Sequence, residues 1–298
     1  MTDVAAVLLS LGEPTTECAL ASIREQTLPA SEVVVVDGVT PFHKALNDGA
    51  ARVESPYFVQ VDADMTLEPD CFETLRRAMG PDTAIAVGAL DDPLVGRVAG
   101  VKMFRRSVFA DGGLRDTPAP EVDFYMSLAR AGWHTRWVVE RPILGLHRPP
   151  YDAAYVFGTY FMLGARYVHR GDEAALAWRL GRLRRSPHPM APAARIALGH
   201  GTFARVSGDE PKPCPSPADA RFLDALVDGP EGSVAARELR ALLRLRPPRL
   251  AQGFREYGAH LRAEDPGRVR GGLRLLGEID HGHSLLGEVA FGHGAMAA

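Results

Sequence analysis

Short apolar runs alternate with segments of helical periodicity in the first half of the chain. Residues 4–9, 33–36 and 57–61 are runs of branched and aromatic side chains, which predict buried strands. Segments 15–26, 42–52 and 69–79 follow these runs and repeat their apolar positions at helical spacing. The order strand, helix, strand predicts a parallel sheet with right-handed crossovers.

The same alternation continues to about residue 150. Segments 83–90 and 98–104 predict two more strands, separated by the turn residues Asp91-Asp92-Pro93. A helix is expected over 121–130, a strand over 135–139, and a loop over 141–150. The first half is therefore predicted to be an α/β domain.

The pattern of apolar positions changes beyond residue 150, where helical spacing predominates. Segment 151–185 has a helical pattern with no strong breaker, and segments 234–245 and 250–261 predict further amphipathic helices. Residues 207–219 are rich in Pro, Ser and Asp and predict an exposed linker. We therefore expect a domain over 1–150 and a helical region over 151–298.

The composition of the chain indicates the class of protein and the cellular compartment in which it works. The chain has 298 residues, 46% hydrophobic and 24% charged, as in ordinary globular proteins. Residues 1–150 carry 14 Lys and Arg against 21 Asp and Glu, whereas the remainder carries 20 against 16. The three widely spaced cysteines indicate a reducing compartment, and the apolar runs are too short for a signal peptide or a membrane span. We expect a cytoplasmic protein, with peripheral membrane association left open.

An acidic pair, Asp62 and Asp64, ends the apolar run that begins at Tyr57. In an extended strand the two carboxylates would share a face and repel each other. A divalent cation or a hydroxyl-rich ligand would relieve this repulsion, and ligands of open α/β sheets bind at the carboxyl ends of strands. The alternative is an Asp-rich turn that caps the next helix.

Several motifs occur in one order and together carry more weight than any one of them. Roughly residues 4–150 resemble the family 2 glycosyltransferases, which have the GT-A fold. The matching pieces are the first strand, Val33–Asp37, the helix 44–51, the stretch 59–64, Phe104-Arg105-Arg106 with Gly112-Gly113, and the segment from Glu121 to Trp133.

The resemblance implies a GT-A sheet and transfer of a sugar, a hexose or a related one, from a nucleoside diphosphate sugar to an acceptor hydroxyl, with inversion. Asp37 looks like the nucleotide contact, and Asp62 like the residue near the ribose and the metal. Asp64 looks like the direct ligand of Mg²⁺ or Mn²⁺, and His147 falls where many members have a further metal ligand. For His147 the alternative is an ordinary surface-loop histidine.

The catalytic base is aligned backwards from Ala131-Gly132-Trp133. This alignment places Glu121 on the base position of the family, with Asp123 as the second candidate. A carboxylate at a helix N-terminus is stabilised in its charged form, which suits a base and equally suits a helix cap.

Two departures from the family pattern leave rival functions open. The loop after the first strand is Leu11-Gly12-Glu13-Pro14 instead of the usual Pro-Thr-Tyr-Asn, and only about seven residues separate Asp37 from Lys44, so the sheet is expected to be one strand short. A degenerate domain that binds a nucleotide sugar without turnover, and a nucleotidyltransferase, are the alternatives. The acceptor is expected to be a glycan, lipid, protein or small molecule, with nucleic acid least favoured. The helical region over 151–298 would then serve acceptor binding or oligomerisation, and homo-oligomer formation stays open.

Overall fold

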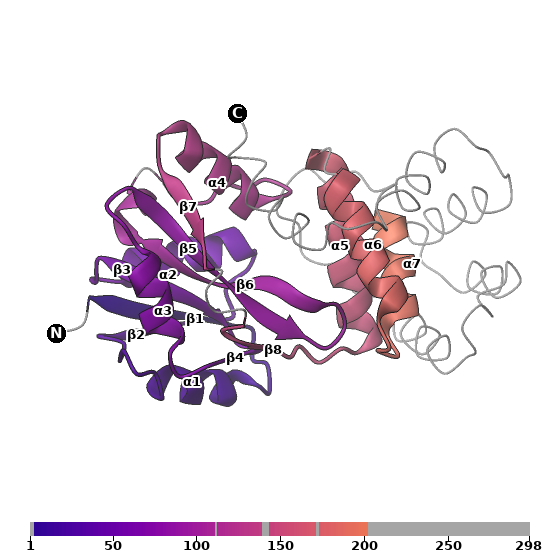
Figure 1. Cartoon of the computed structure of the whole chain (residues 1–298), viewed down its shortest axis with the longest axis horizontal. Coiled ribbons are helices and arrows are strands. Elements are labelled where there is room, and N and C mark those ends of the chain that lie inside the picture. The colour runs from indigo at the N-terminus through magenta and orange to yellow at the C-terminus, as the bar shows by residue number, and fades with distance from the viewer. Residues whose placement is uncertain (1–2, 111, 139–142, 171–172, 202–298) are drawn as a thin grey trace, which may run out of the picture. The chain divides into compact units, whose positions relative to one another are not determined.

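The computed structural model describes residues 3–110, 112–138, 143–170 and 173–201 (Figure 1). These residues divide into two compact units, the first ending at Pro149 and the second beginning at Pro150. The expected linker over 207–219 and the expected helices over 234–245 and 250–261 lie outside the described residues. The roles that were assigned to the two regions stay predictions.

The first unit contains eight strands and their connecting helices. The strands are β1 Val4–Ser10, β2 Val33–Asp37, β3 Tyr57–Asp62, β4 Met65–Leu67, β5 Thr83–Asp92, β6 Gly96–Arg105, β7 His134–Trp137 and β8 Gly145–His147. The helices are α1 Thr16–Arg24, α2 Phe42–Arg52, α3 Cys71–Ala78, the short 3₁₀ helix η1 Arg106–Phe109, and α4 Pro120–Arg130.

The strands form one sheet in the order β2-β1-β3-β6-β5-β8-β4, with β7 against β5. The pairs β1–β2, β1–β3, β5–β7 and β5–β8 are parallel, whereas β6 is antiparallel to both β3 and β5, and β4 is antiparallel to β8. All strands except β4 and β6 therefore run in one direction, which confirms the predicted α/β fold with a mostly parallel sheet. Their C-terminal ends lie on one side of the sheet, termed here the carboxyl edge.

Helices cover both faces of the sheet because alternate strand residues point to opposite sides. Ala6 and Val59 face α1 and α3 in one apolar cluster, whereas Val7 and Phe58 face α2 and α4 in the other. In Figure 1, α1 lies below the sheet and α4 lies above it. Each strand of the centre is thus buried on both faces, as its continuous apolar run predicted.

An aromatic cluster holds α4 on the sheet. The ring centroid of Phe58 in β3 lies 5.4 Å from that of Phe104 in β6 and 5.3 Å from that of Phe109 in η1. Phe124 of α4 lies 5.0 Å from Phe109. These contacts fix the height and rotation of α4, and with them the position of its first turn.

One expectation for this unit needs correction. His147 does not lie in a loop, because it is the last residue of β8, which pairs with β4. Strand β4 was not expected: β3 ends at Asp62, and a turn at Ala63 and Asp64 leads into β4. Strands of three residues carry too little periodicity to be recognised in a sequence.

Strand β2 is an edge of the sheet within the described part of the chain. On one face Val34 and Val36 pack under α2, but Val33 and Val35 on the other face are 42% and 38% exposed. This arrangement fits the short connection after Asp37, in which the sequence has no room for the additional helix and strand expected from the resemblance.

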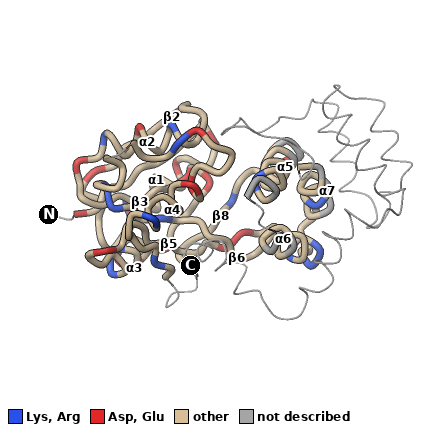
Figure 2. The backbone as a smooth tube through the Cα atoms, turned by 90° about the horizontal axis from the view of Figure 1, so that it is seen from above, with Lys and Arg blue, Asp and Glu red and all other residues tan. Residues whose placement is uncertain are grey.

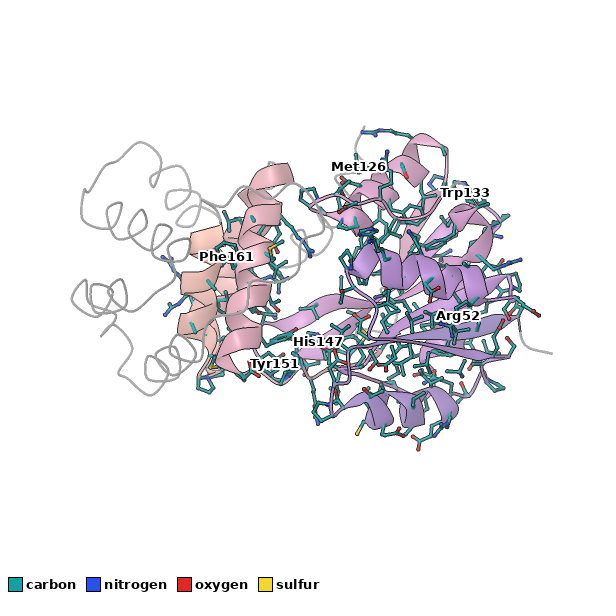
Figure 3. All side chains as sticks on the ribbon, turned by 180° about the vertical axis from the view of Figure 1, so that it is seen from behind. Arg52, Met126, Trp133, His147, Tyr151 and Phe161 are labelled. Atoms are coloured by element: carbon teal, nitrogen blue, oxygen red, sulfur yellow. The ribbon has the colours of Figure 1, made fainter. Side chains whose placement is uncertain are left out.

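The second unit consists of helices α5 Ala153–Arg170, α6 Glu173–Arg185 and α7 Ala191–Gly201. The segment 151–185, which reads as one helical pattern, thus forms two helices. Gly164 in α5 and Gly201 in α7 lie where an added Cβ would meet the backbone of the other helix, at the carbonyls of Leu198 and Phe161. Helices α5 and α7 therefore pack backbone against backbone, and Figure 3 labels Phe161 at this level of α5.

Candidate functional site

Four polar residues that are far apart in the sequence lie at the carboxyl edge. Asp62 ends β3, Asp64 stands in the following turn, Asp92 ends β5, and His147 ends β8. The backbone N–H of Arg148 donates to the carbonyl of Asp64 at 2.7 Å, which ties the turn to β8. The sheet topology alone thus brings the predicted metal ligands Asp64 and His147 side by side.

His147 stands between two carboxylates. Its Nε2 lies 3.3 Å from Oδ2 of Asp64, and its Nδ1 lies 2.7 Å from Oδ2 of Asp92. Burial alone would lower the pKa of His147, but the hydrogen bonds and charges of Asp64 and Asp92 outweigh it and raise the pKa to about 9. Figure 3 labels His147 among the side chains of this region. A surface-loop histidine, the alternative interpretation, does not describe this residue.

Asp92 is the most enclosed of the four residues, with 4% of its surface exposed. Its Oδ1 accepts the backbone N–H groups of Leu94 at 2.8 Å and Val95 at 2.9 Å, in the turn between β5 and β6. The sequence placed Asp92 in a turn, whereas it is the last residue of β5 and only its side chain reaches into the turn. The sequence contained no sign of its contact with His147.

Asp62 lies beside a second group of buried polar side chains. Its Oδ1 accepts a hydrogen bond from Nε2 of Gln60 at 2.9 Å. Burial and then the negative charge of Asp64 raise the pKa of Asp62 to about 6, with Glu121 adding to this effect and Lys102 and Gln60 opposing it. These charge interactions connect the acidic pair to the first turn of α4.

Glu121 in that first turn forms an ion pair with a lysine of the sheet. Nζ of Lys102 lies 2.7 Å from Oε1 of Glu121, and the two side chains are 11% and 32% exposed. Lys102 of β6 is also the cross-strand neighbour of Gln60 in β3. The hydroxyl of Tyr125, one turn further along α4, is buried without a hydrogen-bond partner in the described residues, and burial and then Glu121 raise the pKa of Tyr125.

The other two predicted residues are placed differently. Asp123 follows Glu121 by two positions, about 200° around the helix, so the two do not share a face of α4. Asp37 ends the edge strand β2 and is exposed. It lies at the carboxyl edge, two strand spacings or roughly 10 Å from Asp62 across β1.

The acidic pair and His147 offer oxygen and nitrogen ligands to a divalent cation. Within the described ranges no cluster of three or more His, Cys, Asp and Glu residues could hold a metal by itself. However, Oδ1 of Asp64 is buried without a hydrogen-bond partner among the described residues, next to the imidazole of His147. One carboxylate and one imidazole suit Mn²⁺, and Mg²⁺ at phosphate-binding sites takes one or two carboxylates and completes its shell with substrate phosphates and water. The residues therefore fit a metal that arrives with a diphosphate.

A cavity of about 470 Å³ lies beside α2 and η1, away from the acidic pair. Its lining includes Asn47, Arg106 and Gly113 but no carboxylate. It therefore lacks the ligands that a divalent cation needs.

Several arginines make contacts with backbone carbonyls and aromatic rings. Arg105 donates to the carbonyls of Thr83 and Gly80 and lies over the rings of Tyr57 and Trp133. In the second unit, Arg179 and Arg182 lie over the ring of Trp178. Figure 2 shows acidic and basic positions interspersed over the first unit. Among the described helices, none is both long and apolar enough to cross a bilayer.

Sequence reasoning missed Lys102, Gln60 and Asp92. Lys102 and Gln60 are single polar residues inside otherwise apolar strands, and this interruption is the signal that could have identified them. A long charged side chain is almost never buried without a partner, so an isolated Lys in a central strand predicts a buried carboxylate nearby. Which carboxylate that is depends on the topology.

Comparisons with known proteins give structural neighbours only. No family model matches the chain, and no curated protein matches it. A mannosyltransferase from Pyrobaculum calidifontis, solved with GDP-mannose and Mn²⁺, is 14% identical with a TM-score of 0.46 over 92% of this chain and 84% of that one. Glucosyl-3-phosphoglycerate synthase from Mycobacterium tuberculosis, with Mn²⁺, UDP and phosphoglyceric acid, is 16% identical with a TM-score of 0.38, over 55% and 78%.

A third neighbour, CMP:2-keto-3-deoxy-manno-octonic acid synthetase with CTP, is 13% identical with a TM-score of 0.34, over 45% of this chain and 88% of that one. The neighbours thus include glycosyltransferases of the type that the sequence motifs resemble, and one enzyme of another type. At these identities and TM-scores the likeness does not identify an activity. The function is therefore argued from the side chains.

Proposed function

We propose that the protein transfers a sugar from a nucleoside diphosphate sugar to an acceptor hydroxyl, with a divalent cation and with inversion. The observation that carries this proposal is the pair of Asp64 and His147 at the carboxyl edge, in which Oδ2 of Asp64 faces the imidazole and the buried Oδ1 has no hydrogen-bond partner in the described part of the chain. Ligands of open α/β sheets bind at this edge, and a diphosphate would complete the coordination of a cation held there.

In this proposal Asp64 and His147 hold the metal, and Asp62 supports it from the end of β3. When bound, Mn²⁺ or Mg²⁺ supplies Lewis-acid stabilisation of the negative charge that develops on the leaving diphosphate. Asp62, whose pKa is raised to about 6 without a cation, would be kept ionised by the positive charge beside it. Asp37, exposed at the end of β2, would contact the nucleotide.

Glu121 is the proposed general base. It would take the proton of the acceptor hydroxyl, whose oxygen then attacks the anomeric carbon while the bond to the diphosphate oxygen breaks. A single displacement of this kind inverts the anomeric centre. Lys102 holds the carboxylate of Glu121 in place through the ion pair between its Nζ and Oε1. Asp123, the second candidate, faces another side of α4, which favours Glu121.

The test is a donor screen that reports released nucleoside diphosphate for the common UDP, GDP, dTDP and ADP sugars, with Mn²⁺, Mg²⁺ or EDTA. We expect release with one donor class, loss of that release with EDTA, and a reduction of about 100-fold or more in Asp64→Ala, in which the metal loses its direct carboxylate. Asp82→Ala is the matched control, because it is the same change at a side chain that is 64% exposed.

The outcomes separate the rival functions. Release of pyrophosphate from a nucleoside triphosphate, instead of nucleoside diphosphate from a sugar donor, would indicate nucleotidyl transfer. Tight binding of a nucleotide sugar in calorimetry without turnover would indicate a binding scaffold. If no donor released nucleoside diphosphate and no metal dependence appeared, the proposal would be overturned.

A further inference from the structure

We propose that Asp92 is a positioning residue that holds the imidazole of His147 in the tautomer that can bind a metal. The inference rests on the proposed function, because it concerns the metal named there. It adds a residue that the sequence motifs do not contain.

The hydrogen bond between the two side chains determines which ring nitrogen carries a proton. A carboxylate can only accept, so the 2.7 Å contact between Oδ2 of Asp92 and Nδ1 of His147 requires Nδ1 to donate. In a neutral imidazole the other nitrogen, Nε2, then has its lone pair free. Nε2 is the nitrogen that faces Asp64, at 3.3 Å. Metal-binding histidines commonly donate their second nitrogen to a carboxylate in this way.

Asp92 is itself held in one orientation. Its second oxygen, Oδ1, accepts two backbone N–H groups, those of Leu94 and Val95, in the turn between β5 and β6. Strand β8, which carries His147, pairs with β5 next to this turn, at Asp91 and Leu146. Backbone hydrogen bonds therefore fix both partners, and the imidazole has little freedom to turn away.

The same two N–H groups make Asp92→Asn an informative variant. They require an acceptor, so the amide oxygen of the asparagine would face the turn and its NH₂ group would face His147. An NH₂ group donates, so Nδ1 would have to accept and the proton would move to Nε2. The variant thus preserves the turn but favours the tautomer whose metal-facing nitrogen has no free lone pair.

The experiment measures Mn²⁺ affinity by electron paramagnetic resonance, with UDP and GDP in turn as the accompanying diphosphate. We expect Asp92→Asn to weaken Mn²⁺ binding by about 10- to 100-fold, the usual effect of losing the partner of a ligand histidine. Asp91→Asn is the same change at the exposed neighbouring position. Its Mn²⁺ affinity should stay within about twofold of the wild type, because such losses are expected only for a residue that holds a ligand histidine. Thermal unfolding followed by circular dichroism checks that each variant is folded.

A double-mutant cycle separates positioning from a general structural effect. In a His147→Ala background Asp92→Asn should cause no further loss of Mn²⁺ affinity, because the imidazole through which Asp92 acts is gone. Should Asp92→Asn fail to fold, Asp92→Ser is the second variant. Its hydroxyl can accept a turn N–H but is too short to reach His147, so it should weaken binding as well.

Two results would overturn the inference alone: wild-type Mn²⁺ affinity in the folded Asp92→Asn variant, or an equal loss with and without His147. If the wild type itself bound no Mn²⁺ with either diphosphate, the metal dependence in the proposed function would be wrong, and this inference would be wrong as well. The two failures are therefore distinguishable.

Discussion

Nζ of Lys102 in β6 lies 2.7 Å from Oε1 of Glu121 in α4, and the lysine side chain is only 11% exposed. The pair joins the sheet to the helix that carries the proposed base. A buried charge that loses its partner is costly, because neither water nor another group compensates it.

Lys102→Met should therefore destabilise the first unit by about 3 kcal/mol at pH 7, at the low end for buried pairs because Glu121 is partly exposed. The double variant Lys102→Met with Glu121→Gln should recover more than half of that loss. Urea unfolding followed by circular dichroism measures both. The control Arg52→Met breaks the half-exposed pair of Arg52 and Asp48 and should cost less than about 0.5 kcal/mol. A double variant no more stable than the single one would contradict this account.

Two helical glycines of the second unit should respond oppositely to alanine. A Cβ at Gly164 would meet the carbonyl of Leu198 in α7, so Gly164→Ala should lower stability by roughly 1–3 kcal/mol. A Cβ at Gly181 in α6 would meet only the guanidinium of Arg185, at 3.6 Å or more. Gly181→Ala should therefore raise stability by about 0.5–1 kcal/mol, through the higher helix propensity of alanine. Thermal unfolding of the two variants should shift in opposite directions, and equal shifts would disprove backbone contact between α5 and α7.

Arg105 should contribute to the stability of the fold and not to the binding of the nucleotide sugar. Its guanidinium donates to two backbone carbonyls and stacks on Tyr57, a geometry that a lysine ammonium cannot reproduce. Arg105→Lys should lower stability by about 1.5–3 kcal/mol, the usual range for hydrogen bonds to a charged group. The affinity for the nucleotide sugar should stay unchanged in calorimetry. Weaker donor binding with unchanged stability would contradict this structural role of Arg105.

His147 should make the metal-free protein more stable at neutral than at alkaline pH. Its pKa rises from 6.5 to about 9 on folding, so the charged form is favoured in the folded state. This stabilisation, on the order of 3 kcal/mol, is fully present below about pH 6.5 and is lost as the pH rises through 9. Urea unfolding in EDTA from pH 6 to 10 should show the decline in the wild type but not in His147→Gln. His134→Gln, a change at an exposed histidine beside Asp82, should retain the wild-type decline.

The fold could be predicted where the chain repeats a strong local pattern. Helix α2 begins and ends at the predicted residues, and β2 follows its run of valines. Strands β4 and β8 could not be predicted, because each has three residues and exists only through its pairing with the other. The division of segment 151–185 into α5, which ends at Arg170, and α6, which begins at Glu173, could not be predicted either, because the sequence of this segment contains no strong helix breaker.

The candidate site was predictable in part for the same reason. Asp62 and Asp64 end an apolar strand, so their place at the edge of the sheet follows from local pattern alone. The partners of Lys102 and His147 do not follow from local pattern. Glu121 lies 19 positions from Lys102, and Asp92 lies 55 positions from His147. Such contacts are set by the order and direction of strands, above all by the reversal of β6.

The turn between β5 and β6 also limits how the protein can be re-engineered. One carboxylate, Asp92, closes this turn and contacts His147, so the hairpin and β8 form a single module. A chimaera that exchanges the hairpin with that of another sheet protein would have to bring an acidic residue at this position, or exchange β8 as well. Loop grafting at this site is therefore expected to succeed only with both segments together.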